Sequence, residues 1–155
     1  MHPLFFMNRI IRGVGMYKKI MVAVADDEIS WNALQSAIHI ASADGAKLCV
    51  VHAAPIARDD EKNDSSRQAG ADLLQRAKLA AAGKLDVETR LLEAEGDYGL
   101  NGISEAIANA VAEWDTDLLV VGTKGRRGLE RLVVGSVAEQ LVGAVAASVL
   151  LARSR

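Results

Sequence analysis

Cysteine is almost absent from this sequence, and so are long apolar runs and any excess of charge of one sign. The single cysteine, Cys49, excludes an internal disulfide framework. It lies in the apolar run 48–51, where a lone cysteine is usually a small buried hydrophobe, and it indicates a reducing compartment. The net charge of −2 gives no electrostatic case for binding nucleic acid or an anionic membrane.

Common sequence motifs of nucleotide-binding and metal-binding sites are missing as well. No P-loop pattern GxxxxGK[ST] occurs, and no G-x-G-x-x-G follows the first predicted strand. His2, His39 and His52 are scattered without metal-ligand spacing to the cysteine, and we expect structural roles for His39 and His52. The sequence therefore predicts no catalytic residue and no metal-ligating residue.

The first fifteen residues differ from the rest of the chain. Arg9 and Arg12 interrupt their apolar residues, which leaves neither a signal-peptide core nor the roughly 20 apolar residues of a membrane span. A strand pattern begins directly after Met16. We interpret residues 1–15 as an N-terminal extension that is disordered or results from an upstream start codon, with a short amphipathic anchor as the alternative. Residues 16–155 are predicted to form one domain.

Strand and helix patterns alternate through this domain. Continuous apolar runs predict strands at residues 20–25, 48–51, 118–121 and 149–152, the first of them buried on both faces. Residues 87–91 alternate between apolar and charged, which indicates a strand at a sheet edge. Helical spacing of apolar residues predicts helices over 34–41, 71–82, 103–114 and 137–145. The polar stretch 55–70 is interpreted as a surface loop.

This alternation predicts an α/β fold. Strands joined by helices form right-handed crossovers, so the sheet should be parallel and covered on both faces, giving a three-layer sandwich. With an edge-like third strand, the doubly wound, flavodoxin-like order 3-2-1-4-5 fits best. Ligands of such sheets bind beyond the carboxyl ends of the strands where the winding reverses, here strands one and four.

The most informative segment follows the fourth predicted strand. Gly122 and Gly125 allow the backbone to turn sharply and to approach a ligand closely. Ser136 lies at the expected N-cap of the last helix, and Glu139 three residues later completes a capping box. A helix N-terminus suits a phosphate, and Arg126 adds positive charge nearby. Such features also occur in proteins that bind nothing, but here they coincide at the ligand-binding end of the sheet.

The spacing Gly122-x-x-Gly125, nine residues, then Gly135-Ser136 resembles the motif of the ATP-binding branch of the universal stress protein family. The resemblance extends over residues 16–153 and includes the opening strand at 18–24 and the fourth strand at 117–122. It implies a stress-response or signalling module that binds ATP, with or without Mg²⁺, or a related adenine nucleotide. It implies little chemistry, at most slow ATP hydrolysis, and a cytoplasmic location.

The resemblance also implies which residues hold the nucleotide. The glycine loop and the Gly-Ser pair hold phosphates and ribose, the backbone after strand two meets the adenine, and the end of strand one lies near the nucleoside. In this sequence the corresponding residues are Val24, Ala25, Asp26, Ala53, Val121, Gly122, Gly125, Arg126, Gly135, Ser136 and Val137. The family usually has an aspartate where Ala25 stands, so either the chain shifts by one and Asp26 serves, or that contact is missing.

Two other functions compete with nucleotide binding. A nucleotide-free dimeric scaffold of the same family would keep the loop without its ligand. A response-regulator receiver domain shares the fold, and Asp26, Asp27 and Thr123 superficially suit its site. A receiver domain would need an aspartate directly after strand three and a lysine after strand five. The sequence has neither, and Arg153 stands at the second position.

The last predicted strand also bears on assembly. It is wholly apolar although it should lie at a sheet edge, and exposed apolar edges favour pairing. We therefore expect a homodimer joined through Val149, Leu150 and Leu151, as the family resemblance also implies, with cover by the N-terminal segment as the alternative.

Overall fold

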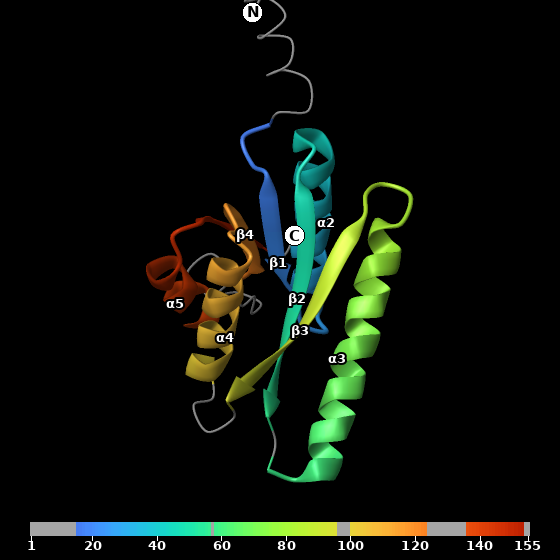
Figure 1. The fold of residues 1–155 in the computed structure, drawn as a ribbon, viewed down its shortest axis with the longest axis vertical. Helices are drawn as coiled ribbons and strands as arrows, with labels where there is room; N and C mark the ends of the chain where they lie inside the picture. Colours follow the sequence, from blue (N-terminus) through green and yellow to red (C-terminus); the bar gives the residue numbers. More distant parts are fainter. Residues whose placement is uncertain (1–14, 57, 96–99, 124–135, 154–155) are drawn as a thin grey trace, which may run out of the picture.

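Strands and helices alternate along the chain in the computed structural model, which describes residues 15–56, 58–95, 100–123 and 136–153 (Figure 1). The elements, in chain order, are β1 (Lys19–Ala23), α2 (Glu28–Asp44), β2 (Lys47–Ile56), α3 (Asp60–Ala81), β3 (Val87–Glu95), α4 (Leu100–Glu113), β4 (Leu118–Gly122), α5 (Ser136–Ala144) and β5 (Ser148–Ala152).

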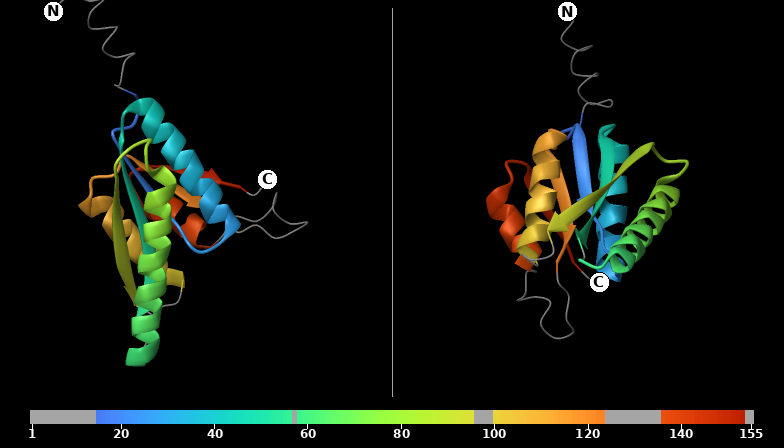
Figure 2. Two further views of the ribbon diagram at one scale, coloured as in Figure 1. Left: turned by 90° about the vertical axis from the view of Figure 1, so that its right-hand side faces the viewer. Right: turned by 60° about the horizontal axis from the view of Figure 1, so that its bottom comes forward.

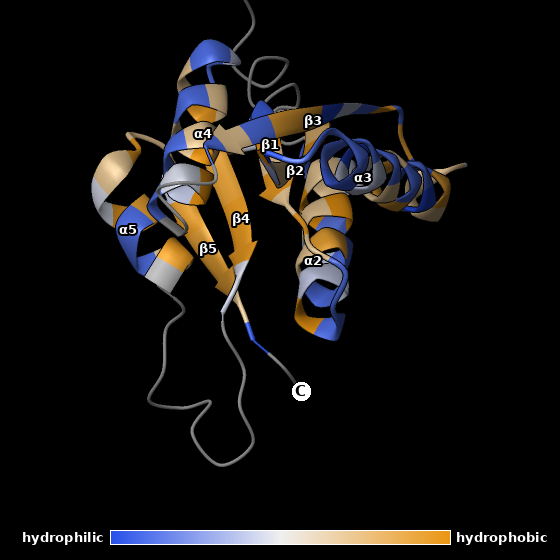
Figure 3. Ribbon diagram, turned by 90° about the horizontal axis from the view of Figure 1, so that it is seen from below, coloured by the Kyte–Doolittle hydropathy of each residue, from blue (hydrophilic) through white to orange (hydrophobic). Residues whose placement is uncertain are grey.

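The strands of the described residues form one parallel sheet in the order β3-β2-β1-β4-β5, which confirms the predicted order. Helices α2 and α3 lie on one side of the sheet, and α4 and α5 lie on the other (Figure 3). The result is the three-layer sandwich that the alternating pattern predicted.

Side chains of the central strands alternate between two apolar cores, one on each face. Val22, Val50 and Val120 pack towards α2 and α3 and are fully buried. Cys49 and Leu119 pack towards α4 and α5 and are also fully buried. Burial raises the pKa of the Cys49 thiol to about 12, with Glu88 adding to the effect, so the thiol stays protonated at neutral pH. The prediction of a buried, structural cysteine is confirmed.

Helix α3 begins earlier in the chain than the sequence predicted. Residues 60–70, expected to be loop, form its first turns. Asp59 caps this helix by accepting hydrogen bonds from the backbone N–H groups of Glu61 and Lys62. Most side chains in these turns are exposed to solvent, so the sequence carries no apolar periodicity there.

Strand lengths also differ from the prediction. β2 continues to Ile56 and β3 to Glu95, whereas β1 ends at Ala23. The paired ends of β2 and β3, together with the start of α3, therefore project beyond the carboxyl end of β1 (Figures 1 and 2). This projection borders the edge of the sheet at which a ligand was predicted.

Hydrogen bonds of Asp117 connect the strands at the opposite, amino end of the sheet. Its carboxylate accepts the backbone N–H of Lys18 at 2.8 Å and that of Lys19 at 3.1 Å. Its own N–H donates to the Lys19 carbonyl, and its carbonyl accepts from Ser148. One half-buried aspartate thus joins the starts of β1, β4 and β5.

We expect Asp117→Ala to lower the free energy of unfolding by about 2 kcal/mol, because two backbone donors lose a charged acceptor. Asp117→Asn keeps one acceptor oxygen and should lose about half as much. Urea unfolding of both variants measures the difference. Equal losses in the two variants would contradict the role given to the second oxygen.

Candidate functional site

The winding of the sheet reverses between β1 and β4. From β1 the chain continues to β2 on one side, while β4 pairs with the other side of β1. Val22 pairs with Val120, which places the residues after β1 level with Gly122. We call the carboxyl edge formed by residues 24–26, 53 and 121–123 the switch-point edge; ligands of open α/β sheets bind at such edges.

The connection from β1 to α2 is held by its own hydrogen bonds. The Ala25 N–H donates to Ser30 Oγ at 2.8 Å. The Ser30 N–H donates to Asp27 Oδ1 at 2.7 Å, which makes Asp27 the N-cap of α2. The Asp27 carboxylate is therefore engaged in capping the helix. The sequence signal for this cap is an aspartate three residues before Ser30.

Asp26 points away from β4. Its exposed carboxylate lies 3.5 Å from Arg76 Nη1 on α3, and the Arg76 guanidinium stacks 5.7 Å from the ring centroid of Trp31. Helix α3 packs on β2 and β3, on the side of β1 opposite to β4. An exposed ion pair of this kind contributes under about 1 kcal/mol to stability. The informative feature is therefore the direction in which the Asp26 side chain points.

The carboxyl end of β2 extends beyond β1, so one backbone edge of β2 has no neighbouring strand there. The Lys47 N–H donates to the Lys18 carbonyl and the Val51 carbonyl accepts from Val24, so odd-numbered residues of β2 direct their peptide groups towards β1. Ala53 is the next such residue. In a regular ladder its N–H would donate to the Val24 carbonyl, but no such backbone bond forms. That carbonyl instead accepts a hydrogen bond from His52 Nδ1 at 2.7 Å.

Gly122 lies where β4 meets the first turn of α2. A Cβ at this position would lie 2.5 Å from Ile29 Cγ2 and 3.4 Å from Ile29 backbone atoms, so any larger residue would require the Ile29 side chain to move. The next residue, Thr123, donates its N–H to the Ala152 carbonyl at 2.8 Å. The entrance to the glycine-rich loop is therefore fixed both to α2 and to β5.

Most of the predicted site residues that the structure describes lie at the switch-point edge. Val24, Ala25, Asp26, Ala53, Val121 and Gly122 follow one another across the ends of β2, β1 and β4. The Val121 side chain belongs to the core, so only its backbone is available to a ligand. Val137 is half-buried against the same core. Gly125, Arg126 and Gly135 lie outside the described residues.

Ser136 differs from its prediction by one position. It is the first residue of α5 instead of the residue that precedes the helix. Helix ends commonly shift by a residue in this way, because terminal turns have few hydrogen bonds to define them.

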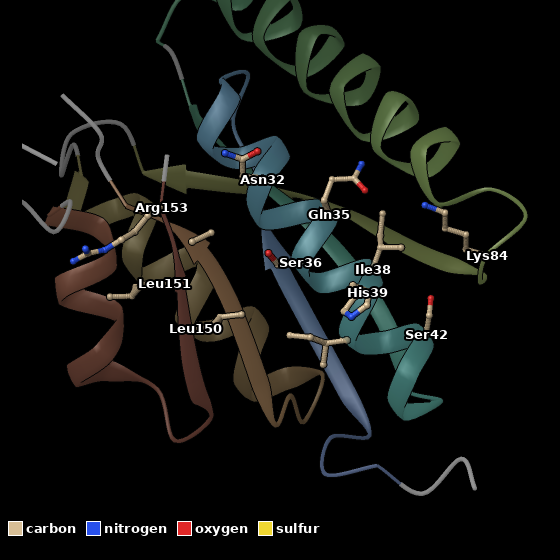
Figure 4. A pocket seen from close by; sticks show the side chains of 12 residues that line it. Asn32, Gln35, Ser36, Ile38, His39, Ser42, Lys84, Leu150, Leu151 and Arg153 are labelled. Carbon is tan, nitrogen blue, oxygen red and sulfur yellow. The ribbon is translucent and has the colours of Figure 1, made fainter. Parts of the chain in front are cut away.

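A groove lies elsewhere on the molecule. It has a volume of about 1170 Å³ and runs between α2 and the edge strand β5 (Figure 4). Asn32, Ser36 and His39 line it from α2, and Leu150 and Arg153 line it from β5 and its end. None of the predicted nucleotide-binding residues lines this groove.

Among the described residues, no group of three or more His, Cys, Asp or Glu side chains is arranged to hold a metal ion. In the same part of the chain, none of the helices combines the length and apolarity needed to cross a membrane.

The strand order and the helices on both faces define a doubly wound α/β domain whose winding reverses at the switch-point edge. The model of the universal stress protein family matches residues 16–153. A putative universal stress protein of Staphylococcus saprophyticus is 33% identical over 150 residues, covering 89% of this chain and 84% of that protein. This chain belongs to the universal stress protein family.

Solved structures agree with the fold. The universal stress protein UspA from Lactobacillus plantarum superposes with a TM-score of 0.75 at 18% identity, covering 90% of this chain and 99% of that one. A universal stress protein in complex with cAMP superposes with a TM-score of 0.70 at 26% identity, covering 91% of this chain and 100% of that one.

Proposed function

We propose that this protein binds ATP or a related adenine nucleotide at the switch-point edge and acts as a cytoplasmic stress-response module. The observation that carries the proposal is the free peptide edge at Ala53. An N–H donor beside a C=O acceptor complements N1 and the N6 amino group of adenine. The relative that was crystallised with cAMP, an adenine nucleotide, supports the same choice of base.

Phosphates would extend from this edge towards the glycine-rich loop. Gly122 begins that loop next to the end of β1, and Gly125, Arg126, Gly135 and Ser136 follow in the sequence. Backbone N–H groups at the start of α5 would face the anionic end of the ligand. We propose that any Mg²⁺ arrives with the phosphates, and that the bound nucleotide is a ligand with at most slow hydrolysis.

A titration with ATP and magnesium tests the proposal. ATP at a hundred times its dissociation constant should stabilise the fold by about 2.7 kcal/mol, measured as a rise in the thermal midpoint. Gly125→Val is the matched control: a side chain there should occupy the space of the phosphates and abolish the shift. Protein without any shift at millimolar ATP would favour the nucleotide-free scaffold. The packing of Gly122 on Ile29 gives that alternative a basis, because a scaffold would also need this glycine.

We also propose that the protein is a homodimer joined through β5. The two edges of the sheet differ in charge. β3 carries Glu88, Arg90 and Glu93, which discourage pairing, whereas β5 carries no charged residue. Leu150 on β5 remains 37% exposed. Pairing of two β5 strands would continue the sheet and cover this residue in both copies.

A further inference from the structure

The structure assigns His52 a specific task, which rests on the proposed function: it holds the adenine-reading peptide edge of Ala53 open. His52 lies on β2, one residue before Ala53, and is half-buried. Its Nδ1 lies 2.7 Å from the Val24 carbonyl oxygen. Because a carbonyl can only accept, Nδ1 must carry the hydrogen.

This hydrogen bond replaces a ladder bond. Val24 N–H still donates to the Val51 carbonyl, so β1 and β2 remain paired up to this point. The next bond in a parallel ladder would join the Ala53 N–H to the Val24 carbonyl. With the His52 ring on that oxygen, the N–H of Ala53 stays available at the switch-point edge, and the C=O of Ala53 lies beyond the end of β1. The imidazole thus ends the ladder one bond early.

The surroundings of the ring fix its orientation. A Cβ added at Gly70 on α3 would lie 3.0 Å from His52 Cδ2 and 2.7 Å from Leu91 Cδ1. The ring therefore packs directly against the backbone of α3. Glycine inside a helix costs about 1 kcal/mol relative to alanine, and here it provides the space that the imidazole occupies. His52 is held between Val24 on one side and Gly70 on the other.

The selectivity expected of this edge follows from the order of its donor and acceptor. Adenine presents an N6 donor beside the N1 acceptor, whereas guanine presents an O6 acceptor beside an N1–H donor. A backbone N–H and C=O in fixed positions match only one of these orders, and the wrong base leaves polar groups unpaired. His52 is therefore a positioning residue for base selection.

The test compares ATP with GTP, which share their triphosphate and ribose, in three forms of the full chain. Isothermal titration of the unmodified protein should show tighter binding of ATP. His52→Phe keeps an aromatic ring but cannot donate, so Ala53 can pair with Val24. We expect its ATP affinity to fall about tenfold, the effect of one or two neutral hydrogen bonds, with GTP affinity unchanged. His52→Asn, whose amide can donate as Nδ1 does, should restore the preference for ATP.

The outcomes separate this inference from the proposed function. If the unmodified protein binds neither nucleotide, the proposed function fails. If it binds ATP but His52→Phe retains the same ATP-to-GTP ratio, or loses both ligands equally, His52 has only a structural role. Failure of His52→Asn to recover the ratio would likewise overturn the hydrogen-bond argument.

Discussion

Replacing Leu150 with lysine is expected to convert the protein from a dimer into a monomer. Leu150 is an exposed apolar side chain on β5, the edge strand without charged residues. In the proposed dimer two β5 strands meet, so each copy would bring an ammonium group into an apolar contact. A buried charge without a partner costs several kcal/mol, far more than a strand pair of this length gains. Sedimentation equilibrium should show the mass of one chain instead of two.

Leu79→Lys provides a matched control for this result. Leu79 is even more exposed, at 63%, but it lies on α3, which covers β2 and β3 at the other end of the sheet. The same change there should leave the dimer intact. A dimer that survives Leu150→Lys would remove β5 from the interface.

Replacing Gly122 with valine is expected to lower the free energy of unfolding by about 3 kcal/mol in the absence of nucleotide. The added carbons would meet Ile29 Cγ2, and the Ile29 backbone behind it cannot move without displacing the start of α2. Overpacking of a filled contact usually costs about 1–3 kcal/mol, and a branched side chain belongs at the upper end. Chemical denaturation without ligand measures this loss separately from any effect on phosphate binding.

Gly143→Ala is the control for glycine replacement as such. A Cβ at Gly143 on α5 meets nothing within 4 Å, so alanine should be neutral or stabilise the helix by up to about 1 kcal/mol. If Gly122→Val is as stable as the unmodified protein, the contact with Ile29 does not explain this glycine. Its role would then be limited to the ligand.

Local patterns predicted most of the fold because each buried strand is a short run of apolar residues. The runs at 20–25 and 118–121 favoured strands in the middle of a parallel sheet, and both are central in the structure. The end of α2 also has a local cause, since Gly45 takes the left-handed conformation at φ 67° that glycine favours. The first turns of α3 were missed because exposed polar residues form helix without an apolar stripe.

The candidate site was predictable only as a set of backbone positions. The motif spacing indicates where glycines and a helix start must lie, since those depend on the local chain. It does not indicate that Asp26 turns towards Arg76, because this contact depends on the position of the neighbouring helix α3. The possibility that Asp26 takes the place of Ala25 would require the Ala25–Ser30 and Asp27–Ser30 hydrogen bonds to break.

By itself, then, the sequence determined the family and the order of the strands. Apolar periodicity and glycine spacing are local properties that survive without coordinates. Only the tertiary structure decided that β2 extends further than β1 and that the His52 imidazole bonds the Val24 carbonyl. Those features depend on contacts between strands distant in sequence, which no local pattern encodes.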